Sequence, residues 1–215
     1  MPLPPKGADE AAEVYLWVGI SLSRWEAAED SLMGLFRVLC EKREPTAYAA
    51  YVAAPRTPRA VMLRGAMDRY SKRFIEGEVK QVEEAMRALD KLASRRNEIA
   101  HGYCVHYSSA SMVGHYLLPS FHEQVLIERD PRFAHTPTTM KQFSDAVTKL
   151  AVAVDDVRGA VMVREQEARL ALAAAGRLTP EAADRVTLGE RAQAEHPALQ
   201  GHEAARREHE QEGER

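Results

Sequence analysis

Three long segments of the chain carry an apolar residue at every third or fourth position, the spacing of a helix packed against other helices. These segments lie at about residues 8–42, 78–100 and 136–175. The last of them has the most regular stripe: Met140, Phe143, Val147, Leu150, Val154, Val157 and Val161. The pattern therefore predicts an all-α protein built as an up-and-down helical bundle.

Shorter elements connect the three long helices. Two further helices are predicted at residues 46–53 and 58–74, the second with proline in its first turn. Between residues 103 and 132 the pattern changes to alternation and to β-prone runs split by Pro119 and Ser120, which predicts a small β-hairpin or an ordered loop. We therefore expect a bundle of four to five helices, with this insertion before the last long helix.

Composition divides the chain into two parts. Hydrophobic residues make up 45% of the 215 positions, which is enough for the core of one domain. We assign residues 8–175 to this helical domain. Residues 176–215 lack aromatic side chains and are rich in Glu, Arg, Ala and His, so we predict a charged tail that is disordered or forms a loosely held helix.

Charge, cysteine content and hydropathy exclude several classes of protein. The formal net charge of -3 provides no general attraction to nucleic acid, although it is compatible with a local basic patch. Two cysteines, Cys40 and Cys104, cannot build a disulfide framework. No apolar run reaches the ~18 residues of a membrane span, and residues 1–10 do not resemble a secretory signal, so we expect a cytoplasmic protein without membrane association.

The helix at 78–100 ends in residues suited to acid–base chemistry: Arg96, Asn97 and His101, here called the motif. Gly102 follows, and glycine after the last turn is a common helix terminator. Asn97 and His101 share a helix face, so Asn97 is placed to hydrogen-bond the imidazole and fix its tautomer. Arg96 and His101 diverge by about 140° around the helix. They converge only if the last turn unwinds at Gly102 or if a second copy of the chain supplies the partner.

The motif reads Arg-Asn-Glu-Ile-Ala-His-Gly and resembles that of the HEPN superfamily, in which an arginine and a polar residue precede a histidine by four to six positions. The order of elements over roughly residues 10–160 is also similar, with a long first helix containing Trp25 and Glu29 and a long final helix. The resemblance implies a homodimer whose two motifs meet, and metal-independent endoribonuclease activity on RNA. Many members are non-catalytic, so the alternative is a dimeric binding or scaffold protein in which the motif is structural.

The resemblance also implies a role for each residue of the motif. Arg96 binds the scissile phosphate, His101 acts as general acid or base in attack by the RNA 2′-hydroxyl, and Asn97 orients these groups. An imidazole exchanges protons near neutral pH, and a guanidinium binds the negative charge that gathers around the phosphorus atom. This chemistry needs no metal or other cofactor, and we expect none.

Two charged residues interrupt the apolar stripes of the predicted helices. Glu29 replaces an apolar residue in the first long helix, and Arg96 does so in the helix at 78–100. Because an isolated buried charge is costly, such residues are usually paired. We therefore predict an ion pair between Glu29 and Arg96, which either positions Arg96 for a phosphate or only fixes the register of two helices.

Basic residues supply a candidate surface for RNA phosphates. Arg87, Lys91 and Arg95 follow one another at four-residue spacing toward the motif. A second cluster lies in and around the predicted helix at 58–74: Arg56, Arg59, Arg64, Arg69, Lys72 and Arg73. Both groups suit phosphate binding, and each is also typical of a solvated helix face. The same surface leaves a third function open, the sensing of a nucleotide.

Several histidines and a cysteine near the motif are candidates for a metal site. His101, Cys104 and His106 lie close in sequence, with His115 and His122 following, but their spacing fits no standard zinc pattern. We therefore expect no metal. The resemblance is compatible with a protein partner of the antitoxin type, but no residue pattern indicates one.

Overall fold

The computed structural model describes residues 6–40, 44–108, 112–120 and 133–175, which form a largely α-helical protein with a small two-stranded hairpin. The helices are α1 (Ala11–Cys40), α2 (Pro45–Ala53), α3 (Arg56–Arg69), the short 3₁₀ helix η1 (Ser71–Arg73), α4 (Glu78–Ala100) and α6 (Pro137–Ala174). The hairpin consists of β1 (Gly102–Ser108) and β2 (Val113–Pro119). Within these residues, the predicted helices and the predicted insertion before the last long helix are confirmed.

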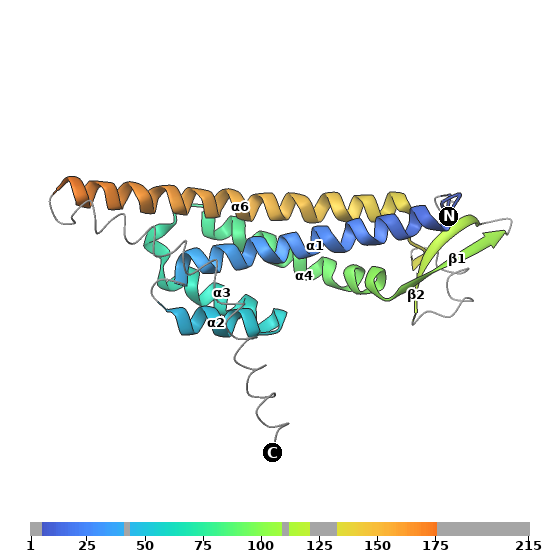
Figure 1. Cartoon of the computed structure of the whole chain (residues 1–215), viewed down its shortest axis with the longest axis horizontal. Helices are drawn as coiled ribbons and strands as arrows, with labels where there is room; N and C mark the ends of the chain where they lie inside the picture. The colour runs from blue at the N-terminus through green and yellow to red at the C-terminus, as the bar shows by residue number, and fades with distance from the viewer. Residues whose placement is uncertain (1–5, 41–43, 109–111, 121–132, 176–215) are drawn as a thin grey trace, which may run out of the picture. The chain divides into compact units, whose positions relative to one another are not determined.

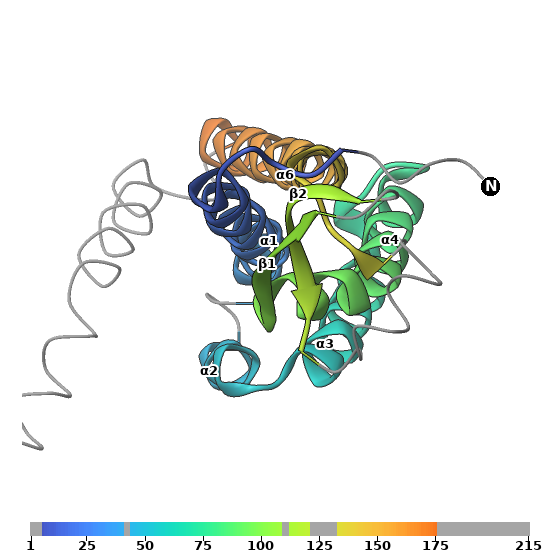
Figure 2. The ribbon, with the colours of Figure 1, turned by 90° about the vertical axis from the view of Figure 1, so that its right-hand side faces the viewer.

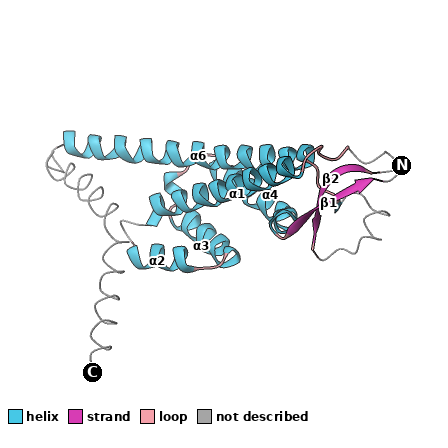
Figure 3. Ribbon diagram, turned by 45° about the vertical axis from the view of Figure 1, so that its right-hand side comes forward, coloured by secondary structure: helices cyan, strands magenta, loops and turns pink. Residues whose placement is uncertain are grey.

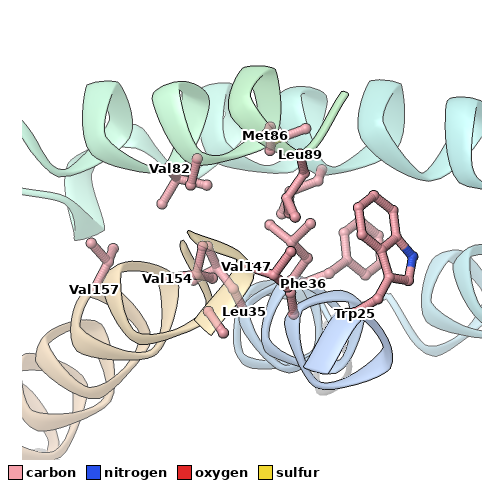
Figure 4. Close-up of a cluster of buried hydrophobic side chains, with 14 of the residues drawn as sticks. Trp25, Leu35, Phe36, Val82, Met86, Leu89, Val147, Val154 and Val157 are labelled. Atoms are coloured by element: carbon pink, nitrogen blue, oxygen red, sulfur yellow. The ribbon is translucent and has the colours of Figure 1, made fainter. Parts of the chain in front are cut away.

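The apolar stripes of α1, α4 and α6 meet in one hydrophobic core (Figure 4). Side chains from the three helices point toward one another: Trp25, Leu35, Phe36, Val82, Met86, Leu89, Val147, Val154 and Val157. Each of them is at most 4% exposed, so the removal of apolar surface from water stabilises the association of the helices. The predicted stripe of the last helix is confirmed as the buried face of α6, with Leu150 only partly buried.

The part of α6 up to Met162 lies beside α1 and runs in the same direction, whereas α4 runs opposite to both (Figure 1). Side-chain contacts join α1 and α6 at matching positions along the two helices. Ser21 Oγ lies 3.1 Å from Ser144 Oγ, and Ser31 Oγ donates to Asp155 Oδ2 at 3.0 Å. Gln81, near the start of α4, donates to a carbonyl in the middle of α6 at 3.1 Å. The end of α4 and the start of α6 therefore lie near each other, beside the hairpin.

The hairpin covers the helices where α4 stops and α6 begins (Figures 2 and 3). On the outer side of β2, His115 pairs with Ala8 and Leu117 pairs with His135, each through two backbone hydrogen bonds of 2.7–2.9 Å. Neighbouring residues of a strand face opposite sides, so β2 contacts two apolar clusters. Leu117 lies in the core of the helices, and Tyr116 belongs to a second, smaller cluster within the hairpin region.

Local contacts set the ends of α4 and α6. Thr136 caps α6, because its Oγ1 accepts from the Thr139 N–H at 3.2 Å while Thr139 Oγ1 accepts from the Thr136 N–H at 2.8 Å. The helix α4 stops before Gly102 as predicted, but Gly102 does not have the positive φ of a left-handed cap. A Cβ at Gly102 would lie 2.7 Å from Leu117 Cγ, so glycine is needed there for the close approach of strand and helix.

Among the described residues, no helix combines the length and the apolar character that a membrane crossing requires. The described residues divide into two units, with the boundary between Met162 and Val163. The hairpin and the helices α1 to α4 belong to the first, and the described part of the second is the end of α6. The β-prone run beyond Ser120 and the tail at 176–215 lie outside the described residues, so those predictions, with the domain boundary after residue 175, stay predictions.

Candidate functional site

The last turns of α4 present one exposed polar face. Arg87, Lys91, Asn97 and His101 are all exposed. Their spacing places them within about 120° of one another around the helix. His101 is the C-cap residue, with φ −108° and ψ 10°. The helix therefore ends with an imidazole in solvent, and an amide and two cationic side chains lie further back along the same face.

Arg96 points away from this face, toward α1. Its Nη2 lies 3.5 Å from Glu26 Oε1, and its Nη1 donates to Asn97 Oδ1 at 3.3 Å. The side chain is 31% exposed, and its buried Nε has no hydrogen-bond acceptor among the described residues. Both contacts are long for charge-assisted hydrogen bonds, so the guanidinium keeps capacity for a further anion.

The prediction that Glu29 and Arg96 form an ion pair is wrong, because each of them pairs with a different residue. Glu29 Oε1 accepts from Arg56 Nε at 2.8 Å, and Arg56 Nη2 lies 3.1 Å from Asp90 Oδ1. Among the described ion pairs, the acid at Arg96 is Glu26, about one helical turn before Glu29. The reason is that the start of α3 places Arg56 between α1 and α4, a position that no stripe in either helix reveals.

Arg56 lines a narrow pocket between α1, α2, α3 and α4, which encloses about 280 Å³ including its open mouth. Its guanidinium lies 4.8 Å from the centre of the Trp25 ring, and Arg59 Nε donates to the Tyr51 carbonyl at 3.1 Å. Burial, reinforced by the Glu29 carboxylate, raises the pKa of Tyr51 to about 12. The charged groups of this pocket bind one another and the backbone, so we interpret the pocket as a junction of four helices.

The hydrogen bonds among the motif residues differ from the predicted ones. The predicted side-chain hydrogen bond between Asn97 and His101 is not among the hydrogen bonds of the described residues. Asn97 instead accepts from Arg96 through its side chain, and its backbone carbonyl accepts from the His101 N–H at 3.0 Å. Asn97 therefore links both other motif residues without orienting the imidazole.

Arg95, predicted to bind phosphate, is engaged inside the protein. Its Nη1 lies 3.0 Å from His135 Nδ1, and its Nε lies 3.4 Å from Glu98 Oε2. His135 is 1% exposed, and its Nε2 lies 3.0 Å from the same Glu98 oxygen. A guanidinium only donates, so Nδ1 of His135 is assigned as the acceptor. Sequence reasoning missed this cluster, which joins the end of α4 to the start of α6, because Arg95 and His135 are 40 residues apart.

Part of the second predicted cationic cluster is also engaged within the fold. Arg69 pairs with Glu44 at 2.9 Å, and Arg73 donates to a backbone carbonyl of α1 at 3.0 Å. Of the predicted stripe Arg87, Lys91 and Arg95, the first two lie exposed on the same helix face as His101. These two residues are therefore the members of the predicted phosphate-binding stripe that the fold leaves accessible.

Among the described residues, no group of three or more His, Cys, Asp or Glu side chains is arranged to hold a metal ion. Comparisons of this chain with models of protein families, with curated proteins and with solved structures give no match. The chemistry at the end of α4 is therefore the guide to function. An imidazole can act as a general acid or base, and the Arg96 guanidinium, about 140° around the helix from it, can bind a phosphate.

Proposed function

We propose that this chain is a HEPN-like helical-bundle protein that cleaves RNA as a homodimer, without a metal ion. The observation that carries the proposal is the exposure of His101, which leaves an imidazole at the end of α4 open to a substrate. Lys91 and Arg87 lie further back on the same face, where their charges attract the phosphates of an RNA strand.

Cleavage proceeds by attack of the RNA 2′-hydroxyl on the neighbouring phosphate. His101 removes the hydroxyl proton or donates a proton to the leaving 5′-oxygen, and an imidazole serves either role near neutral pH. Arg96 binds the non-bridging oxygens, where negative charge accumulates in the transition state. Asn97 restrains the guanidinium through the 3.3 Å hydrogen bond from Arg96 Nη1.

A second copy of the chain completes this site. The helix α4 stays regular through Ala100, so Arg96 and His101 leave it about 140° apart. In a twofold dimer the same surface of each subunit faces the other, which lets one subunit supply the group that its partner lacks. The proposed site therefore combines Arg96 of one subunit with His101 of the partner subunit.

A non-catalytic scaffold is the second candidate, and the contact between Arg96 and Glu26 favours it. A carboxylate 3.5 Å from the guanidinium competes with a phosphate for the same donors. In this function the motif fastens α4 to α1 and braces the dimer. Glu26 is 65% exposed, however, and an exposed ion pair contributes little in water, so we place catalysis first.

The first test is cleavage of a mixed-sequence RNA by the full chain in the presence of EDTA. We expect His101→Ala to lower the rate by about 10²–10⁴-fold, because it removes the general acid or base. Lys149→Ala is the matched control, since Lys149 is an exposed cation on a different helix, α6, and it should keep the wild-type rate. Equal rates for the wild type and His101→Ala would show that the motif does not catalyse cleavage.

A mixing experiment tests the shared site. Arg96→Ala and His101→Ala should each be inactive alone, whereas a mixed dimer has one site with both groups. After subunit exchange we expect about a quarter of the wild-type activity, because half of the dimers are mixed and each has one of two sites intact. If the mixture of the two variants is dimeric by light scattering but shows only background activity, the result would favour the non-catalytic scaffold over the shared catalytic site. A monomeric wild type would overturn both candidates.

A further inference from the structure

We propose a second site, on the hairpin, where His106 and His115 together bind one divalent transition-metal ion such as Zn²⁺, Ni²⁺ or Cu²⁺. The two residues are opposite each other in the register of β1 and β2. Their ring centres lie 4.7 Å apart, with 58° between the ring planes. His106 is exposed and His115 is half-buried, so the pair borders the solvent from which an ion arrives.

The hydrogen bonding of β2 explains why the two rings lie so close. The N–H and the C=O of His115 both bond to Ala8, on the outer side of the strand, at 2.7 and 2.9 Å. A strand residue directs both groups to the same neighbour, so His115 and His106 form a non-hydrogen-bonded pair. In such pairs the Cα atoms are about 4.5 Å apart, against ~5.5 Å in hydrogen-bonded pairs, and the side chains approach more closely.

The hydrogen bond of the His115 ring leaves one nitrogen available as a ligand. Its Nδ1 lies 3.4 Å from the Ala8 carbonyl oxygen. Because a carbonyl only accepts, Nδ1 carries the proton and the lone pair is on Nε2. A metal-binding imidazole is commonly oriented in this way, with its second nitrogen donating to a backbone carbonyl. His106 is exposed, so its ring can turn to meet the same ion.

Two imidazoles select the class of ion. Nitrogen ligands suit Zn²⁺, Ni²⁺ and Cu²⁺, whereas Mg²⁺ and Ca²⁺ prefer oxygen. Within the part of the chain that the structure describes, no third His, Cys, Asp or Glu joins them, so the proposed site rests on these two imidazoles. An ion bound in this way joins β1 to β2, and because it binds the folded hairpin it stabilises the folded state.

Calorimetric titration of the full chain with NiCl₂ tests the site. We expect His106→Asn and His115→Asn each to weaken binding by about 10- to 100-fold, because each replaces chelation with a single ligand. His202→Asn is the matched control, since this histidine lies outside the described residues and the substitution retains the pair, so it should bind as the wild type does. MgCl₂ should not bind at this site.

Thermal unfolding provides the second readout. NiCl₂ should raise the melting temperature of the wild type and of His202→Asn, but not that of the two hairpin variants. Equal Ni²⁺ affinity in the wild type and both hairpin variants would overturn the proposal, as would a wild type that binds no Ni²⁺. If a hairpin variant fails to fold, the electron-spin resonance of Cu²⁺ bound to His202→Asn decides. Coupling to two imidazole nitrogens supports the site, and coupling to fewer overturns it.

Discussion

Glu29 and Arg96, the two charged residues within apolar stripes, each contact an opposite charge. They do not contact each other. Glu29 binds Arg56, and Arg96 contacts Glu26. The two carboxylates differ in burial, because the side chain of Glu29 is 13% exposed and that of Glu26 is 65% exposed. A buried carboxylate depends more on its partner than an exposed one does. The first pair therefore contributes more to stability, and the second leaves Arg96 available.

We predict that Glu29→Ala lowers the free energy of unfolding by about 1–3 kcal/mol, because it removes a charge-assisted hydrogen bond from Arg56. Glu26→Ala on the same helix is the matched control and should cost less than about 1 kcal/mol. Double-mutant cycles by urea denaturation separate the partners. We expect a coupling of about 1 kcal/mol between Glu29 and Arg56, and none between Glu29 and Arg96. The opposite ranking of the two couplings would contradict the observed pairs.

Among the elements, the passage from α4 to β1 determines how His101 is presented. The strand begins directly after the cap residue and packs on the last turn of the helix. A Cβ at Gly102 would lie 2.7 Å from Leu117 Cγ and 2.9 Å from the Glu98 carbonyl oxygen, so only glycine fits without a shift. The close junction leaves no unwound segment in which Arg96 and His101 meet, which is why the proposed site needs two subunits.

We predict that Gly102→Ala lowers the free energy of unfolding by about 1–3 kcal/mol, because the added methyl group overpacks the contact with Leu117. Gly65→Ala in α3 is the matched control. A Cβ there meets open space, and alanine is the better helix former, so we expect a gain of about 0.5–1 kcal/mol. Urea denaturation measures both changes. A gain in stability from Gly102→Ala would contradict the close contact.

For the molecule as a whole, alkaline pH weakens the fold through a buried phenol. Tyr51 is 2% exposed, and its ring stacks on Phe36 with 4.1 Å between ring centres. Burial and the nearby Glu29 carboxylate raise the pKa of Tyr51 to about 12, whereas a tyrosine in an unfolded chain has a pKa of about 10. Between about pH 10 and 12, the unfolded chain therefore binds fewer protons than the folded protein, and stability falls as the pH rises.

We predict that raising the pH from about 9 to about 11.5 lowers the free energy of unfolding less in Tyr51→Phe than in the wild type. The two losses, measured by urea denaturation, should differ by about 2 kcal/mol. The comparison isolates Tyr51, because the other titrating groups are the same in both proteins. Tyr15→Phe replaces an exposed tyrosine and should follow the wild type. The same pH dependence in Tyr51→Phe and the wild type would show that the phenol is not shielded.

The candidate site was predictable in part. Spacing grouped Arg96, Asn97 and His101 at the end of one helix, where the structure places them. The acid beside Arg96 was not predictable, because Glu26 lies outside the apolar stripe and reaches Arg96 only when two helices pack. The pairing of His106 with His115 was not predictable either, because the spacing rules for zinc sites do not consider which residues oppose each other across a hairpin.

The sequence by itself determined where the helices lie, which face of each is buried and that His101 closes α4. These are local properties, since hydrophobic spacing and helix ends depend on residues within a few turns of one another. Only the tertiary structure decided that Glu29 meets Arg56 and that His106 faces His115. Ion pairs between helices depend on how the helices are set against one another, and a shift of one residue in strand register turns every side chain to the other face.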